Sequence, residues 1–256
     1  MVGAPAMTSS PMPHHGRAKS LVLHLAPGAF AFAVYLSVCL PIAGALGLPR
    51  YAALAMMGVL LSIGLAGALL YLGKATTGRL SLETVVLYRE RIAPWTLVLA
   101  VAGVFGWALV VLPFVGWIDQ WLLEQVFASW PAQPRIDTTG YSTTRVIGTQ
   151  IASVLIGGII TPIAEELYYR GYLLPRVQWM GLWAVPWTAT LFALAHFHSP
   201  WGFPSRMLLL PVLIYAVQRT RSISVGIWAH CIGNTAGELL ALTELLTAPS
   251  TPSQGF

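Results

Sequence analysis

The sequence is divided into long apolar runs that contain almost no charged residues. A helix needs roughly 20 apolar residues to cross a bilayer, and seven runs are predicted to do so: residues 25–48, 51–73, 94–117, 146–174, 182–197, 203–218 and 223–246. Only helices and closed barrels satisfy their backbone polar groups in lipid. The runs therefore predict an all-α, polytopic transmembrane bundle with about seven spans, and eight as the nearest alternative.

Composition excludes the soluble alternatives. Hydrophobic residues make up 56% of the 256 residues and charged residues only 9%, with a mean hydropathy of +0.71. Because a soluble domain carries about 25% charged residues, a soluble globular enzyme, a disordered protein and a disulfide scaffold are all excluded. The net charge of +5 comes from Lys and Arg scattered between apolar runs, which indicates loops at a lipid bilayer and no nucleic-acid binding.

Four parts are expected along the chain. They are a disordered lead (1–20), N-terminal spans with their loops (21–145), a C-terminal group of helices (146–246) and a short tail (247–256). The fifth and sixth spans are short and contain Pro186, Pro204 and Pro211. Helix breaks at membrane depth are tolerated where protein or a water-filled cavity satisfies the freed backbone groups, so we expect a polar cavity between the C-terminal helices.

Basic residues predict the orientation. A cytoplasmic N-terminus places one group of them in the cytoplasm: Arg17, Lys19, Lys74, Arg79, Arg89, Arg91, Arg176, Arg219 and Arg221. The other side then holds only Arg50, Arg135, Arg145 and Arg206. Because cytoplasmic loops accumulate Lys and Arg, we expect the N-terminus in the cytoplasm. The short loops and the Ala/Gly/Trp-rich composition are compatible with an integral protein of a bacterial inner membrane.

Three charged side chains fall inside the fourth span. Glu166 and Arg170 are four residues apart and are expected to form an ion pair that makes insertion tolerable. Glu165 lies about 100° around the helix from Glu166, so Arg170 cannot neutralise both carboxylates equally well. A carboxylate left incompletely paired in apolar surroundings has the proton affinity that a general base needs. Glu165 is therefore the predicted base.

The fifth and seventh spans carry further polar groups. His196 and His198 are two apart and cannot share one helix face, so at most one is expected in a common site; His196 is the deeper residue, and His198 is expected at the water boundary. His230, Asn234 and Glu238 form one stripe along the last span. Taken alone, such a stripe indicates hydrogen bonds between helices. Polar groups on three spans, if these are neighbours, predict one shared pocket.

A carboxylate, two imidazoles and a carboxamide form a hydrolytic set. Glu165 can take a proton from water that His196 orients, while His230 and Asn234 can donate hydrogen bonds to the oxyanion of a peptide carbonyl. The metal alternative uses Glu165, His196 and His230 as zinc ligands. No H-E-x-x-H motif is present, and Asn234 suits an oxyanion better than zinc. We therefore assign no metal and expect no required cofactor, with zinc as the alternative.

The same residues carry a resemblance to a known family. Glu165-Glu166-x-x-x-Arg170, Phe192-x-x-x-His196 and His230-x-x-x-Asn234 are similar to the three signature motifs of the CPBP intramembrane proteases. This is the CAAX prenyl protease and bacteriocin-processing (ABI) group, which includes the type II CAAX endopeptidase. The similarity covers about residues 146–246.

The resemblance implies an α-helical membrane fold whose site opens from the membrane toward the cytosol. It implies that Glu165 activates water with His196 and that His230 and Asn234 stabilise the oxyanion. Glu166, Arg170 and Phe192 would support the motifs. The family is commonly labelled a metalloprotease, while a glutamate-dependent, metal-free mechanism is also implied for its prenyl-protease members.

The sequence thus predicts an intramembrane endopeptidase that acts on a membrane-embedded or prenylated peptide or protein. The alternative is a non-catalytic membrane protein. It would be a proton-coupled transporter that uses Glu165, Glu166, His196 and Glu238 as a relay, or an immunity or scaffold protein. The half-repeats expected of a transporter are not evident in the sequence. Nothing in the residues identifies the substrate.

Overall fold

The computed structural model describes residues 14–132 and 140–247. Every regular element in these ranges is a helix, and one isolated bridge pairs Arg89 with Ser222. The all-α prediction is therefore confirmed. The predicted N-terminal lead falls largely on residues outside the described ranges, as does Arg135, and helix α1 begins at Arg17, before the lead was expected to end.

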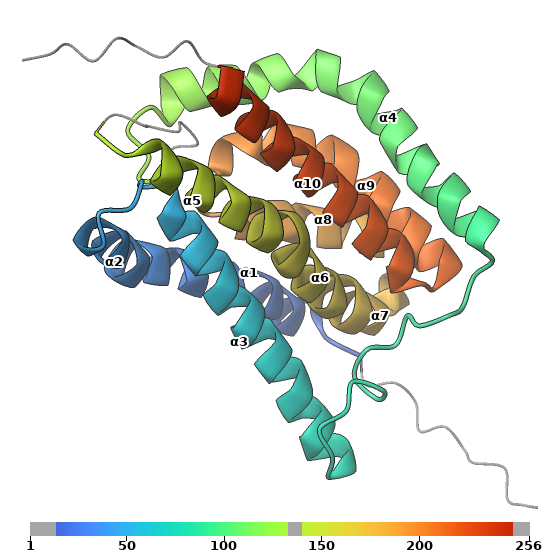
Figure 1. The fold of residues 1–256 in the computed structure, drawn as a ribbon. Coiled ribbons are helices and arrows are strands. Elements are labelled where there is room, and N and C mark those ends of the chain that lie inside the picture. The colour runs from blue at the N-terminus through green and yellow to red at the C-terminus, as the bar shows by residue number, and fades with distance from the viewer. Residues whose placement is uncertain (1–13, 133–139, 248–256) are drawn as a thin grey trace, which may run out of the picture.

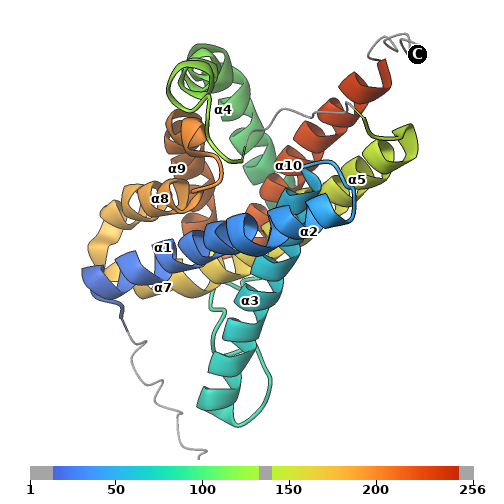
Figure 2. The same ribbon diagram turned by 90° about the vertical axis from the view of Figure 1, so that its left-hand side faces the viewer.

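The N-terminal half contains three long helical rods (Figures 1 and 2). The first consists of α1 (Arg17–Val34), a π turn (Tyr35–Cys39) and α2 (Leu40–Ala45); α3 (Ala52–Thr77) is the second, and α4 (Pro94–Trp121) with a π turn (Leu122–Val126) is the third. Helix α4 packs along α9 and α10 on one side of the bundle, while α3 projects beyond it at the other. Pro94 occupies the first turn of α4, where its missing N–H has no helical partner to lose.

The C-terminal half begins with a rod that changes helix type four times. It comprises α5 (Thr143–Leu155), a π turn (Ile156–Ile160), α6 (Thr161–Glu165), a π segment (Glu166–Leu173) and α7 (Leu174–Arg176). A 3-10 segment (Gln178–Trp183) leads to α8 (Ala184–Ala195), a 3-10 turn (Pro200–Gly202), α9 (Phe203–Thr220) and α10 (Ile223–Thr247). Helices therefore occur at all seven predicted runs, but the sequence pattern did not predict the π segments.

Five of these helical stretches are long and apolar enough to cross a membrane: Arg17–Ala45, Ala52–Thr77, Pro94–Val126, Thr143–Arg176 and Pro200–Thr220. The other two predicted spans do not meet this description. Helix α8 has 12 residues and rises only about 18 Å, less than a bilayer core of about 30 Å. Helix α10 is long enough, but His230, Asn234 and Glu238 lower its hydropathy.

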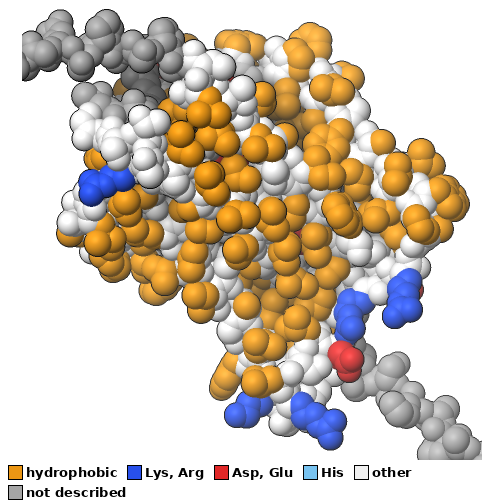
Figure 3. Space-filling model, in the orientation of Figure 1, with side chains coloured by type: hydrophobic (Ala, Val, Ile, Leu, Met, Phe, Trp, Pro, Cys, Tyr) orange, Lys and Arg blue, Asp and Glu red, His pale blue; other side chains and the backbone are white. Residues whose placement is uncertain are grey.

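The outer surface is apolar, as expected of a protein that lies in lipid. Phe30, Leu109 and Phe114 are each more than 70% exposed, and hydrophobic side chains cover most of the face in Figure 3. Monomeric soluble proteins rarely expose apolar patches of this extent. The chain is an integral membrane protein.

The basic residues separate into two groups at opposite ends of α3. At one end, the backbone N–H of His15 bonds to Arg176 O, the Arg176 guanidinium to Val85 O, and the backbone N–H of Glu90 to Arg221 O. At the other end, Arg145 bonds to Gly47 O and Arg50 to Pro131 O. The first group is the one that charge counting placed together. We call this the basic end; part of it lies along the lower edge of Figure 3.

Candidate functional site

The site forms where the fourth predicted span packs closely against α10. A Cβ atom at Gly158 would lie 3.2 Å from Thr235 Cα, so glycine permits this approach, as small residues do between membrane helices. Carbonyl groups of the π turn Ile156–Ile160 accept bonds from α10: Asn234 Nδ2 donates to Gly157 O (3.1 Å) and Thr235 Oγ1 to Gly158 O (3.2 Å). The polar stripe of α10 thus does bond helices together.

Four ionisable side chains form a connected series at this contact. Arg170 Nη1 lies 3.1 Å from Glu166 Oε1, which is the predicted ion pair. The same oxygen lies 2.9 Å from His230 Nδ1, and His230 Nε2 lies 3.8 Å from Glu165 Oε2. We call these four residues the charge series. His230 therefore lies between the two carboxylates, and its orientation is set by Glu166.

The buried end of the charge series is closed off from water. Glu166 and Arg170 are almost completely buried, and the Arg170 guanidinium lies 4.1 Å from the centre of the Phe192 ring, a cation–π contact. Gly226 packs against Glu166, because a Cβ atom there would lie 2.2 Å from Glu166 Oε2. This part of the motif is therefore held rigidly by its surroundings.

His196 enters the site from the end of α8. The helix ends at Ala195, and His196 adopts φ −81° and ψ 55°. Its Nδ1 lies 2.8 Å from Phe192 O. Because a carbonyl only accepts hydrogen bonds, Nδ1 carries the proton and Nε2 remains the acceptor of a neutral imidazole. Phe192 thus orients both Arg170 and His196, which gives its predicted supporting position a physical basis.

A cavity of about 370 Å³ joins the polar groups of four segments. Glu165, His196 and Asn234 all line it, together with Gln150 and Glu238. His230 is not among its lining residues; it lies beside Glu165 instead. The structure therefore brings three of the four predicted catalytic side chains to one cavity and places the fourth in the charge series next to it.

The expectation that only one of His196 and His198 reaches the site was wrong. Both histidines line the cavity. The expectation assumed that α8 continues through both residues, but the helix ends at Ala195. Beyond that point the backbone no longer rotates by a fixed angle per residue, so residues two apart can face the same space.

Sequence analysis did not single out Gln150, which lines the cavity, or Arg206, whose charge acts on the site without lining the cavity. Gln150 is fully buried, and its Nε2 donates to both the backbone O (3.0 Å) and Oε2 (2.9 Å) of Glu238. Arg206, counted above only among the basic residues on the non-cytoplasmic side, donates to Ser199 O and Oγ (2.7 and 2.6 Å), and its positive charge acts on Glu165 and His198. The sequence signal that could have identified Gln150 is an amide side chain inside an apolar run.

The residues of the zinc alternative do not converge as metal ligands. Among the described residues, no group of three or more His, Cys, Asp or Glu side chains is arranged to hold a metal ion. Both nitrogens of His230 face carboxylates, Nδ1 toward Glu166 and Nε2 toward Glu165, and Nδ1 of His196 is engaged by Phe192 O. As arranged here, Glu165, His196 and His230 do not fit a zinc site.

Comparison with known families identifies the same segment of the chain. Residues 147–236 match the family described as Type II CAAX prenyl endopeptidase Rce1-like. This match confirms the resemblance predicted from the three motifs and supports a protease function in general. It spans Glu165, His196, His230 and Asn234 and leaves out α1 to α4. Comparisons with curated proteins and with solved structures found no match.

Proposed function

We propose that the chain is an intramembrane endopeptidase that hydrolyses a peptide bond of a membrane-embedded or prenylated substrate by glutamate-activated water. The observation that carries the proposal is the shared cavity of Glu165, His196 and Asn234 within a segment similar to CAAX prenyl endopeptidases. A buried carboxylate that Arg170 does not pair is otherwise costly in a membrane protein. Its retention beside two imidazoles favours a catalytic role over a purely structural one.

The chemistry follows from the groups that face the cavity. Glu165 removes a proton from water while His196 Nε2 accepts a hydrogen bond from the same water. The water oxygen attacks the peptide carbonyl, and the N–H of Asn234 that Gly157 O does not use donates to the oxyanion. As the C–N bond breaks, Glu165 returns the proton to the leaving nitrogen, which yields a carboxylic acid and an amine.

His230 and Glu166 have positioning roles in this proposal. Glu166 accepts a hydrogen bond from His230 Nδ1, as a carboxylate does when it fixes the tautomer of a catalytic histidine. When His230 is protonated, its Nε2 can donate toward Glu165 or toward the developing oxyanion. Arg170 holds Glu166 in place through their ion pair inside the bundle. The reaction proposed here requires no metal ion.

The N-terminus is proposed to be cytoplasmic, in a bacterial inner membrane, because the basic end carries most of the Lys and Arg residues. The cavity, however, extends toward Tyr51 and Gln150, near the end that carries Arg50 and Arg145. The expectation of a cytoplasmic N-terminus and the expectation of a site that opens to the cytosol therefore place the cytosol at opposite ends of the molecule. We retain the orientation given by charge and propose that the cavity extends away from the cytosol.

The proposal is tested by cleavage of a membrane-anchored peptide with the purified chain in liposomes, with the products identified by mass spectrometry. Prenylated and unprenylated CAAX peptides and a transmembrane reporter serve as substrates. We expect the Glu165→Gln variant to lose at least about 10³-fold in rate, because a general base and the water it orients are lost together.

Glu83→Gln is the matched control, since Glu83 is an exposed carboxylate in the loop after α3. It should cleave at the wild-type rate. Near-normal cleavage by a correctly folded Glu165→Gln variant would show that Glu165 is not the base. Absence of cleavage of every substrate, combined with proton-coupled transport in the same liposomes, would favour the transporter alternative.

A further inference from the structure

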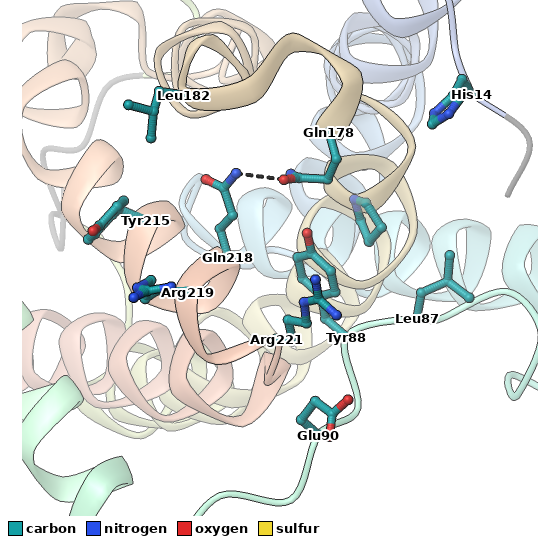
Figure 4. A pocket seen from close by; sticks show the side chains of 11 residues that line it. His14, Leu87, Tyr88, Glu90, Gln178, Leu182, Tyr215, Gln218, Arg219 and Arg221 are labelled. Carbon is teal, nitrogen blue, oxygen red and sulfur yellow. Dashed lines mark hydrogen bonds between the residues drawn. The ribbon is translucent and has the colours of Figure 1, made fainter.

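A second, larger cavity of about 630 Å³ lies at the basic end of the molecule (Figure 4). It is formed by the end of α9, the turn that follows it, the loop before α4 and the segment after α7. None of its lining residues belongs to the proposed active site. Its polar lining includes Tyr88, Gln178, Tyr215, Gln218, Arg219 and Arg221.

Arg219 and Arg221 give this cavity its positive charge. Both are exposed, and within residues 14–132 and 140–247 neither guanidinium forms an ion pair with a carboxylate. Glu90 is the one acidic residue among the described lining residues. Two cations against one anion give the described lining a net positive charge, which favours an anionic ligand.

Hydrogen-bonding groups surround the two arginines. Burial raises the pKa of Tyr88 to about 12, with the Arg221 charge opposing the shift, so its hydroxyl stays protonated and can donate. Gln218 Nε2 donates to Gln178 Oε1 (2.6 Å), as Figure 4 shows. Gln218 Oε1 is buried and has no hydrogen-bond partner among the described residues. A buried acceptor without a partner is unfavourable, so a ligand that donates a hydrogen bond would satisfy it.

The cavity lies beside a segment with the character of a membrane–water boundary. The 3-10 segment Gln178–Trp183 exposes Trp179, Leu182 and Trp183, the last two by 76% each. Tryptophan is enriched where lipid headgroups meet the acyl chains. Leu182 also lines the cavity, on the far side of Gln218 from Arg221 in Figure 4. Apolar side chains at one edge and arginines at the other match a molecule with a polar head and apolar chains.

We propose that this cavity binds the headgroup of an anionic phospholipid that carries hydroxyl groups, of the phosphatidylglycerol type. Its phosphodiester lies between Arg219 and Arg221, with Tyr88 as a further donor. A headgroup hydroxyl donates to Gln218 Oε1, and the acyl chains pass over Leu182 and Trp183. Basic pockets between membrane helices are suited to anionic headgroups in this way. The lipid would hold the α9–α10 turn against the loop before α4.

The test measures the thermal stability of the purified full chain in mixed micelles at rising concentrations of phosphatidylglycerol, phosphatidylcholine or inorganic phosphate. We expect saturable stabilisation by phosphatidylglycerol only. The variant Arg219→Gln/Arg221→Gln should bind this lipid about 25-fold more weakly, because each arginine at an anionic headgroup contributes about fivefold. Gln218→Leu, which keeps both charges, should also lose part of the preference for phosphatidylglycerol over phosphatidylcholine.

The matched control is Lys74→Gln/Arg79→Gln, which removes two charges at the same end of the molecule but outside the cavity. It should bind phosphatidylglycerol as the wild type does. Equal losses in the two double variants would show general surface attraction and overturn the proposal. Equal stabilisation by phosphatidylcholine, or saturation by inorganic phosphate alone, would also overturn it. Because the readout is stability, the result is independent of whether the chain is a protease.

Discussion

The N-terminal helices and the segment 147–236 differ in what they bury. All four buried charged side chains of the described structure, Glu165, Glu166, Arg170 and Arg176, lie in one stretch of the C-terminal half. In the first rod, His24 Nδ1 lies 2.7 Å from Ser20 O in the same helix, while Trp187 Nε1 of the C-terminal half donates to Ser20 Oγ. Among the described residues, buried Asp, Glu, Lys and Arg side chains are therefore confined to the C-terminal half, where the charge series joins two helices.

This difference predicts where substitutions should affect the stability of the protein most. Apolar helices in lipid gain little from specific partners, since lipid tails are as apolar as their side chains. The charge series, in contrast, joins two helices, and loss of either Glu166 or Arg170 leaves the other charge buried without its ion-pair partner. The family match to residues 147–236 alone is consistent with the functional constraint lying in this half.

The largest effect on stability is expected for Arg170→Leu, which removes a buried charge from the C-terminal half. Removing the cation leaves Glu166 buried without its ion-pair partner, and we expect a loss of about 3–5 kcal/mol in unfolding free energy. Arg79→Leu, in an exposed loop, should change it by less than about 0.5 kcal/mol. Both are measured by reversible unfolding in mixed micelles with SDS. Equal values for the two variants would show that the buried pair is not a stabilising contact.

Two glycines of α10 test how closely this helix packs against the charge series. In Gly226→Ala the new methyl group would collide with Glu166 Oε2, whereas at Gly237 nothing lies within 4 Å. We expect Gly226→Ala to destabilise the chain by about 1–3 kcal/mol and Gly237→Ala to stabilise it slightly, because alanine favours helix. The same unfolding assay reads both. Similar effects at the two positions would mean that α10 does not pack closely on the charge series.

The smallest predicted effect concerns His15, which joins the N-terminal end to the C-terminal half. Burial, with Lys19 and Arg176 nearby, lowers its pKa from 6.5 to about 4. The unfolded chain therefore takes up this proton first, so the contribution of His15 is complete above about pH 6.5 and is lost as the pH falls toward 4. We expect His15→Asn to flatten the dependence of melting temperature on pH in this window. An unchanged slope in the variant would contradict this assignment.

Much of the fold could be predicted because apolar runs and charges are strong signals in a membrane protein. The helices, the Glu166–Arg170 ion pair and the grouping of the basic ends all follow from spacing and composition. The site was harder, because tertiary contacts determine it. The end of α8 at Ala195 brings His198 into the cavity, and the position of His230 between two carboxylates depends on how α10 packs. Neither the end of α8 nor the packing of α10 produces a periodic pattern in the sequence.

The central claim is that α10 faces water on one side and lipid on the other. Asn234 lines the cavity, while Ile232, two residues away, is an exposed apolar side chain. The direct measurement is labelling by a small water-soluble thiol reagent of Asn234→Cys and Ile232→Cys in intact membranes, with Cys39 and Cys231 replaced by alanine. We predict that Asn234→Cys is labelled at least about tenfold faster. Equal rates, or faster labelling of Ile232→Cys, would contradict a water-filled site and the hydrolysis proposed for it.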